Sequence, residues 1–338
     1  MDATTIGIDL AKNVFQIHAA NARGKTVFAK RLTCKDYMPF FANFPPCLIG
    51  IEVCSSANYW ARQLKSLGHD VRQISPQFVK PYVKTNKNDY NDAQAICEAV
   101  TRPDMPFVPD KSIEQQDIQA MHRIRMRLVR DRIALVNQTR GLLHEYGVFL
   151  PIGIRPFREQ LPHVLEDAEN ELTFLTREMI ADQAQRLREL DQRIAKYDYR
   201  INDCFKRSET CQRLATIAGV GPIVATDLVA AISDIRYFKN GRHLAAWLGL
   251  VPRQHSSGER SRLLGISKRG DTYLRTLLIH GARSVVSRCD SRADTLGRWI
   301  RDIKVRRGFN RASVALANKN ARIIWALMAH EDTYRTQA

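Results

Sequence analysis

Two apolar segments that each carry a carboxylate constrain the fold of this chain most. Asp9 lies in the run TIGIDL at residues 5–10, and Glu52 lies in LIGIEV at residues 48–53. Both segments are typical of buried strands, where an unpaired ionised carboxylate is costly. Two further acids, Asp89 and Asp92, stand close together in the run NDYNDA. Carboxylates gathered at one point need a cation to neutralise them.

The ligand types indicate which cation this is. Carboxylate oxygens without an accompanying His or Cys cluster favour Mg²⁺ or Mn²⁺ over zinc. The seven cysteines are scattered and form no CxxC pair, so we expect reduced thiols. Because paired ions of this kind break phosphodiesters, the sequence predicts metal-dependent nucleic-acid chemistry.

The first 110 residues predict a mixed α/β domain. Strand patterns cover residues 4–10, 14–20, 26–32, 47–53 and 70–75, and helix patterns cover 59–67 and 92–100. Three hairpin-linked strands followed by β-α-β-α are typical of an RNase H-like (RuvC-like) fold. If the last helix begins by Asp89, then Asp89 and Asp92 share one of its faces. The alternative role for Asp89 is helix capping.

Residues 111–210 predict long helices. Leucines and other apolar residues recur every seven positions from Met121 to Leu142, and every three or four positions from Ile180 to Cys204. The segment 151–156, with two prolines and a glycine, separates the two runs. We expect an antiparallel helical hairpin or coiled-coil arm, serving either as an intramolecular stalk or in subunit association. Arg123 and Arg127 belong to an arginine-rich stretch that is either a solvated face or a nucleic-acid contact.

Residues 211–338 predict a basic, mostly helical domain. This segment holds 22 Lys and Arg against 9 Asp and Glu, and so carries most of the net charge of +17. Such a surplus is expected of a protein that binds a polyanion. Gly219 and Gly221 mark a helix-hairpin-helix whose backbone amides suit a phosphate, although a plain helical corner also fits. No segment predicts a membrane span or signal peptide, which indicates a cytoplasmic, nucleoid-associated protein without a membrane partner.

A loop rich in Ser and Gly follows Pro252. Cations surround it, and we predict that they contact nucleic acid together with Lys12 beside Asp9: Arg253, Arg260, Lys268, Arg269 and Arg275. The loop also places the hydroxyls of Ser256 and Ser257 near a phosphate. From composition alone, Ser257 is more typical of a turn residue than of a nucleophile.

In these motifs the chain resembles the DEDD-type transposases of bacterial and archaeal insertion sequences, which join a RuvC-like domain to a C-terminal serine-containing domain. The resemblance spans nearly the whole length, in the order GIDLAK (7–12), GIE (50–52), KNDYNDA (87–93), GVGP (219–222) and GLVP (249–252) leading to SSG (256–258). It implies that Asp9, Glu52, Asp89 and Asp92 bind Mg²⁺ and that Ser257 is the nucleophile, with Ser256 one residue away as the alternative.

The resemblance also implies the partners. Members are similar to recombinases whose bridge RNA pairs with donor and target DNA, and whose acidic residues meet the serine of another subunit in a dimer or tetramer. Two other functions fit parts of the sequence. A RuvC-like structure-specific nuclease would use a metal-activated water in place of the serine, and a non-catalytic nucleic-acid-binding protein would need only the basic C-terminal third. His255 as a general base and Tyr90 as a stacking residue are open roles.

Overall fold

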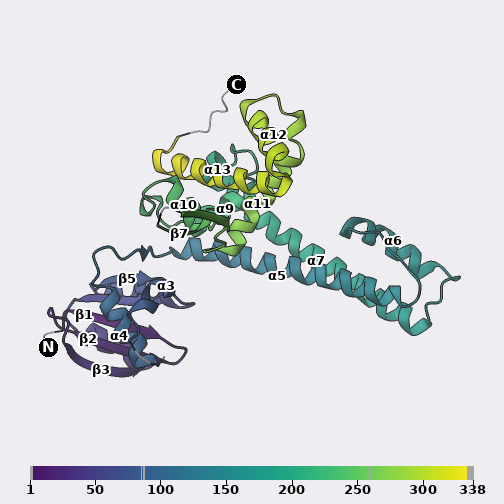
Figure 1. Ribbon diagram of the computed structural model, residues 1–338. Helices are drawn as coiled ribbons and strands as arrows, with labels where there is room; N and C mark the ends of the chain where they lie inside the picture. The colour runs from purple at the N-terminus through teal and green to yellow at the C-terminus, as the bar shows by residue number, and fades with distance from the viewer. Residues whose placement is uncertain (1–2, 85, 87, 259, 333–338) are drawn as a thin grey trace. The chain divides into compact units, whose positions relative to one another are not determined.

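The computed structural model describes residues 3–84, 86, 88–258 and 260–332, and gives the backbone alone for the strand residues Arg260 and Ser261. The chain divides into two compact units, residues 1–112 and residues 113–338 (Figure 1). Each unit has hydrophobic clusters of its own.

The first unit is built on a six-stranded mixed sheet with the order β3-β2-β1-β4-β5-β6. β1, β2 and β3 form an antiparallel meander, β4 and β5 run parallel to β1, and β6 pairs antiparallel with β5. Alternate side chains such as Ile8 and Ile51 are fully buried, as the period of a strand requires. The bounds are β1 Thr5–Leu10, β2 Val14–Ala20, β3 Thr26–Thr33, β4 Leu48–Glu52, β5 Asp70–Ile74 and β6 Phe107–Val108.

The expected mixed sheet is confirmed. The described part of this unit also contains the α-helices α1 Cys34–Ala42, α2 Ala57–Ser66, α3 Pro76–Val79 and α4 Asp89–Ala99, and the short 3-10 helix Lys80–Tyr82. α1 was not predicted, because Pro39 stands inside it. A proline in a helix interior removes one backbone hydrogen bond. However, Tyr37 of α1 is buried against Phe15 and Trp60, and Phe41 is buried against His69. Packing therefore overrides the local helix-breaking signal.

A long helical arm begins the second unit. α5 (Ile113–His144) and α7 (Phe174–Arg207) pack side by side, and the short α6 (Ile154–Glu166) lies at their far end (Figure 1). Arg132 of α5 pairs with Asp191 of α7, Nη1 to Oδ1 at 3.0 Å, and Arg125 pairs with Asp198, so the two helices run antiparallel. Leu128 and Leu135 of the seven-residue pattern are buried, whereas Leu142 is exposed and Leu143 takes its place in the seam.

The rest of the second unit is a helical core with one β-hairpin. Its helices are α8 Glu209–Leu214, α9 Pro222–Ala231, α10 Gly241–Trp247, α11 Thr272–Ser287, α12 Thr295–Arg307 and α13 Phe309–His330. α11 and α13 pack together on α9 and α10 and enclose the largest hydrophobic cluster. The segment that begins at Pro252 was expected to be a loop but forms β7 Pro252–Ser257 and β8 Arg260–Ile266. Among the described helices, none is long and apolar enough to cross a membrane.

Candidate active site

Asp9 and Glu52 lie at matching positions on neighbouring parallel strands. β1 and β4 pair in the register Gly7 to Gly50 and Ile8 to Ile51, so the next step of the ladder brings Asp9 beside Glu52. Both residues are near the carboxyl ends of their strands, and both are partly buried. The sequence pattern therefore delivers two carboxylates to one end of the sheet.

Helix α4 crosses the sheet directly over two glycines of these strands. A Cβ on Gly7 would stand 2.2 Å from the carbonyl oxygen of Ala93, and a Cβ on Gly50 would stand 3.0 Å from Cγ2 of Ile96 in α4 and 2.8 Å from the Cβ of Val100, the residue that follows α4. Both glycines therefore face α4. Because alternate strand residues share a face, the side chains of Asp9 and Glu52, two residues further on, leave the sheet on the α4 side as well.

The first turn of α4 carries the other two acids. Its N-cap is Asn88, whose side chain accepts a hydrogen bond from the Asn91 amide at 2.8 Å. Asn88, not Asp89, therefore caps the helix. Asp89 and Asp92 both lie within the helix, three residues apart, and so share one of its faces. Their negative charge is favourable at a helix N-terminus.

The helix also runs in the direction that brings its first turn toward Asp9. The Cys97 thiol lies 3.7 Å from the Thr5 carbonyl, while Ala93 lies over Gly7, so earlier helix residues meet later strand residues. Four helix residues advance about 6 Å, which matches two residues of a strand. This correspondence directs the beginning of α4, with Asp89 and Asp92, toward the Asp9–Glu52 end of the strands.

The backbone directs the four acidic residues toward one end of the sheet, but their side chains do not gather around a single point. Within residues 3–84, 86, 88–258 and 260–332, no three His, Cys, Asp or Glu side chains are arranged to hold a metal ion. The donor set itself consists only of carboxylate oxygens, which suit a hard divalent cation. Tyr90, between the two aspartates, is 43% exposed and meets the His18 ring edge-on at 5.5 Å, so it makes a packing contact.

The two serines lie at the tip of the β7–β8 hairpin. Ser257 pairs in register with Arg260 and Ser256 with Ser261, and Gly258 makes the turn with φ +57°. Every residue of β7 is exposed. The serine hydroxyls are therefore presented to solvent on a short two-stranded projection.

Strand alternation separates Ser257 from Ser256. The Ser256 hydroxyl accepts a hydrogen bond from Gln254 Nε2 at 2.8 Å, on one face of the hairpin. Ser257 shares the other face with His255, which stands opposite Arg262. Arg262 was missed because the segment was interpreted as a loop; an alternating strand pattern would have placed this exposed cation beside Ser257.

The cations predicted around this hairpin fall into different environments. Arg253, Lys268 and Arg269 are exposed, and the Arg260 side chain lies outside the described part of the chain. Arg275 corrects the prediction, because it is buried and donates to the carbonyls of Arg269 at 3.0 Å and Leu248 at 3.3 Å. It stabilises the turn below the hairpin and presents no charge to a ligand.

That turn is held by close backbone contact. A Cβ on Gly249 would lie 2.1 Å from the Arg269 carbonyl oxygen, and one on Gly270 would lie 1.9 Å from that of Trp247. Both glycines have positive φ values, and Lys268 has φ +55°. The exposed side chains of Lys268 and Arg269 therefore project from a rigid turn.

The two glycines of the predicted helix-hairpin-helix lie in different surroundings. Gly219, with φ +88°, packs against Gly281 of α11, and a Cβ on it would lie 2.8 Å from the Gly281 carbonyl oxygen. Both glycines line a cavity of about 570 Å³ with Ser284 and Arg292, but a Cβ on Gly221 would have no atom within 4 Å. Gly219 thus has a packing role, while Gly221 faces open space.

Some of the arginines of α5 form ion pairs within the arm, and others are exposed. Arg125 pairs with Asp198 of α7 and Arg132 with Asp191, so both join the two helices. Arg127 pairs with Asp131 within α5 but remains 77% exposed, and Arg123 is exposed. Lys12, predicted to contact phosphate, is exposed in the turn between β1 and β2.

A buried polar group lies where α5 meets α9 and α11. The His122 ring contacts the Thr226 hydroxyl at 2.9 Å and the Tyr273 hydroxyl at 3.3 Å. Burial lowers the pKa of His122 to about 4 and raises that of Tyr273 to about 12. Asp227 of α9 is also buried, and burial, together with the charge of Asp271, raises its pKa to about 7.

Comparison with known proteins finds sequence similarity over nearly the whole chain. A profile described as "Transposase IS116/IS110/IS902 family" matches residues 211–298, and the profile of the DEDD domain of IS110-type transposases, described as "Transposase", matches residues 6–148. A probable family 20 transposase of Pseudomonas aeruginosa is 49% identical over 99% of each chain.

Two further relatives have names that refer to insertion sequences. The transposase for insertion sequence element IS1111A of Coxiella burnetii is 45% identical over 100% of this chain and 93% of its own length. The transposase for IS1328 of Yersinia enterocolitica is 41% identical over 96% and 97%. The chain therefore belongs to the IS116/IS110/IS902 family of insertion-sequence transposases and is a DNA transposase.

Proposed function

We propose that this transposase cuts and rejoins DNA with two half-sites, a metal-binding set of four carboxylates and a serine nucleophile. The observation that carries the proposal is the close approach of α4 to Gly7 and Gly50. This approach directs Asp89 and Asp92 toward the ends of the strands that hold Asp9 and Glu52. Four carboxylates directed toward one end of a sheet repel one another, and a bound cation relieves that repulsion.

The strand order supports an RNase H-like, RuvC-like fold for the first unit. An antiparallel β1–β3 meander continues through β4 and β5 parallel to β1, and a helix lies across the central strands. This is the order that we expected for such a fold. β6 adds a short sixth strand at the edge beside β5.

In this proposal Asp9, Glu52, Asp89 and Asp92 hold Mg²⁺ or Mn²⁺. When bound, the ion supplies charge stabilisation at the scissile phosphate. The partial burial of Asp9 and Glu52 lowers the local dielectric and so strengthens their attraction for a cation. Lys12, exposed in the turn after Asp9, is positioned on the same strand connection to contact a DNA phosphate.

Ser257 is our proposed nucleophile. Its Oγ loses its proton and forms a bond to phosphorus while the bond from phosphorus to one sugar oxygen breaks, and that oxygen gains a proton as it leaves, so the step has no net change in protons. The serine–DNA phosphoester retains the bond energy, so an incoming DNA hydroxyl can reverse the step and rejoin the strand. Ser257 shares its face of β7 with His255, opposite Arg262, whereas Ser256 already accepts a hydrogen bond from Gln254.

We further propose that a bridge RNA guides the choice of donor and target DNA. The positive charge of residues 213–338 suits backbone contacts, which position nucleic acid without specifying its sequence. Arg253, Lys268 and Arg269 are exposed near the serine hairpin and suit this role. The acidic half-site and the serine half-site belong to different compact units, and we propose that they combine between subunits of a dimer or tetramer.

The test compares two neighbouring serines on nicked and junction DNA. Ser257→Ala should abolish a protein–DNA adduct seen on denaturing gels, while the matched control Ser256→Ala should retain it. If Ser257→Ala cleaves DNA as well as the wild-type protein does, the result would support the alternative, a structure-specific nuclease that uses water as the nucleophile. Undiminished strand exchange by Asp9→Asn would refute the metal half-site. A wild-type protein that binds nucleic acid but neither cleaves nor rejoins it would support a non-catalytic binding protein.

A further inference from the structure

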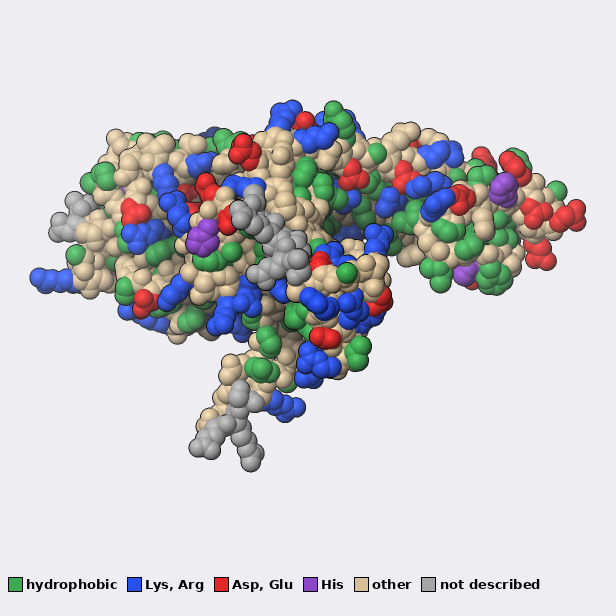
Figure 2. Space-filling model, turned by 90° about the horizontal axis from the view of Figure 1, so that it is seen from above, with side chains coloured by type: hydrophobic (Ala, Val, Ile, Leu, Met, Phe, Trp, Pro, Cys, Tyr) green, Lys and Arg blue, Asp and Glu red, His purple; other side chains and the backbone are tan. Residues whose placement is uncertain are grey.

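The far end of the helical arm exposes large apolar side chains. Phe149 is 75% exposed, Ile152 95% and Phe174 85%, and Leu175 and Met179 lie exposed on the same end of α7. We call residues 145–182 the arm tip. At the right-hand end of Figure 2, hydrophobic and acidic side chains gather on it. Exposed apolar residues grouped in this way mark an interaction surface.

The arm tip is acidic in a chain that is otherwise strongly basic. Residues 145–182 hold eight Asp and Glu against three Arg and Lys, while the whole chain has a net charge of +17. This surface repels DNA and RNA backbones. A protein surface with apolar and basic character is its complementary partner.

The arm tip is a built surface. The Thr176 hydroxyl donates to the Tyr146 hydroxyl at 2.8 Å across the end of the arm. The Arg177 guanidinium donates to the carbonyls of Leu165 and Asp167, each at 2.8 Å, and so fastens the chain after α6 onto α7. Little ordering entropy remains to be lost when such a surface binds.

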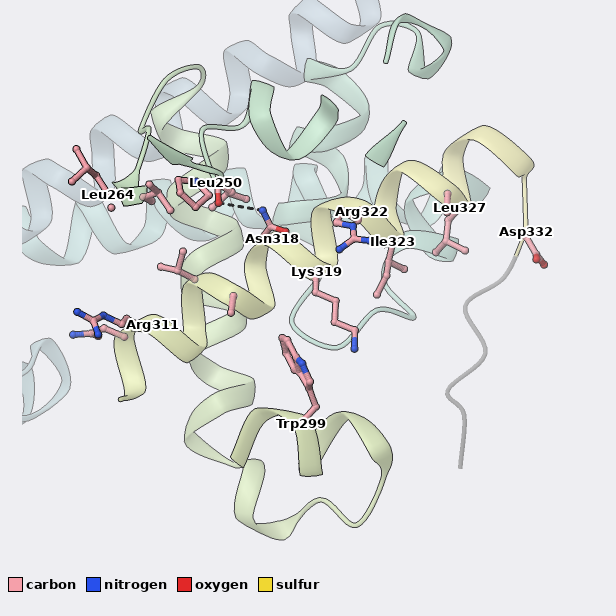
Figure 3. A pocket seen from close by; sticks show the side chains of 17 residues that line it. Leu250, Leu264, Trp299, Arg311, Asn318, Lys319, Arg322, Ile323, Leu327 and Asp332 are labelled. Carbon is pink, nitrogen blue, oxygen red and sulfur yellow. Dashed lines mark hydrogen bonds between the residues drawn. The ribbon is translucent and has the colours of Figure 1, made fainter. Parts of the chain in front are cut away.

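A groove with the opposite charge lies along α13. It has a volume of about 1340 Å³, and α13, Trp299 of α12 and the base of the β7–β8 hairpin line it (Figure 3). The floor is mainly apolar, with Leu250, Ile266 and Ile323 among its side chains. Its charged side chains are three cations, Arg311, Lys319 and Arg322, against the single acid Asp332.

The two surfaces cannot meet within one molecule. The arm base packs on α9, in the core that carries the groove, and from His122, which contacts Thr226 of α9, α5 extends about 33 Å to its end at His144. The paired helices of the arm are stiffened by cross-links such as Arg132 to Asp191. The groove of another copy is therefore the available partner.

We propose that the arm tip of one copy docks into the α13 groove of a second copy, with its apolar side chains on the groove floor and its acids beside Arg311, Lys319 and Arg322. Two features favour a protein segment over a nucleic-acid strand as the occupant of the groove. The floor is largely apolar. The Trp299 ring, which could otherwise stack on a base, is already covered by Lys319, whose Nζ lies 4.5 Å from the ring centroid. This inference deepens the composite site proposed above and rests on it, because the groove continues into the base of the serine hairpin.

The test measures self-association of the full-length protein by sedimentation velocity, without nucleic acid. Phe149→Ser with Ile152→Ser removes the apolar tip, and Arg311→Glu with Lys319→Glu reverses the groove charge. Each pair should raise the dissociation constant at least about tenfold. Val305→Ser, at an 86% exposed site on α12, and Arg306→Glu with Arg307→Glu are the matched controls and should leave it unchanged.

Mixing separates an interface from a folding defect. An equimolar mixture of the tip variant and the groove variant restores one intact tip–groove pair per dimer, so association should recover in part. A wild-type protein that stays monomeric, or variants that associate like wild type, would overturn the proposal. So would a groove variant that loses binding to duplex DNA while the tip variant and wild type associate equally. Ser257→Ala should associate normally, so failure of the serine chemistry and failure of the interface are distinguishable.

Discussion

Gly7→Ala tests whether α4 positions the acidic half-site. The new Cβ would lie 2.2 Å from the Ala93 carbonyl oxygen and 2.3 Å from the Cys97 nitrogen, both backbone atoms of α4. Ordinary contact begins at 3.4 Å, so the helix must move away from β1 by roughly 1 Å. Overpacking of this kind costs about 1–3 kcal/mol of folding stability.

The displacement should reduce activity more than stability. Asp89 and Asp92 move with α4, while Asp9 and Glu52 stay on the sheet. A misplacement of about 1 Å at a reacting centre lowers the rate by on the order of 100-fold. Gly50→Ala should act in the same direction but more weakly, because its closest contact is a side-chain atom, the Val100 Cβ at 2.8 Å.

The assay combines strand transfer with hydrogen exchange of peptides from residues 89–99. Gly7→Ala should lose strand transfer and speed exchange in α4, while the arm exchanges as in wild type. Gly141→Ala, in α5 with no atom within 4 Å of the new Cβ, is the matched control and should stabilise the arm by about 0.5–1 kcal/mol. Full activity in Gly7→Ala, or a larger defect in Gly50→Ala, would refute the reasoning.

Three further predictions concern the second unit. Burial raises the folded-state pKa of Asp227 to about 7, so the folded protein keeps its proton where the unfolded chain has lost it, and stability falls by up to about 1.4 kcal/mol per pH unit between about pH 4 and pH 7. Asp227→Asn should flatten this fall in melting temperatures recorded from about pH 4.5 to 8; an unchanged slope would contradict it. Arg275→Met leaves the carbonyls of Leu248 and Arg269 without their donor and should lower the free energy of unfolding by about 2–4 kcal/mol, whereas exposed Arg269→Ala should change it little and weaken nucleic-acid binding at low salt. Asp191→Ala removes the partner of both Arg132 and Arg158 and should cost about 1–2 kcal/mol in thermal unfolding, with equal stability speaking against a role for this pair in the arm.

The strands and long helices could be predicted because their patterns depend on local burial. The apolar runs around Ile8 and Ile51 match β1 and β4, and the seven-residue repeat through Leu128 and Leu135 matches the seam of the arm. α1 could not be predicted in this way, because its stability comes from Tyr37 and Phe41 packing against residues of other elements. The repeat also cannot show that the seam shifts from Leu142 to Leu143 where the arm ends.

The site was harder to predict where burial decides a residue's role. Arg275 and Arg269 have the same side chain and are six residues apart, yet one is enclosed by carbonyl groups and the other is exposed. Gly219 and Gly221 are similarly indistinguishable in sequence, and only the approach of Gly281 shows that the first is a packing residue. The hairpin of Ser257 was missed because Ser, Gly and Arg are typical of loops, although β7 and β8 alternate across two faces.

The antiparallel register of the arm allows its length to be changed in steps of seven residues. Arg125 pairs with Asp198 and Arg132 with Asp191, so a step of seven residues up one helix corresponds to a step of seven down the other. Deleting seven residues from both helices at facing positions preserves every remaining partner and shortens the arm by about 10 Å. A deletion from one helix alone breaks all pairs beyond it. The reach of this transposase can therefore be reset in fixed increments, while its folded ends stay the same.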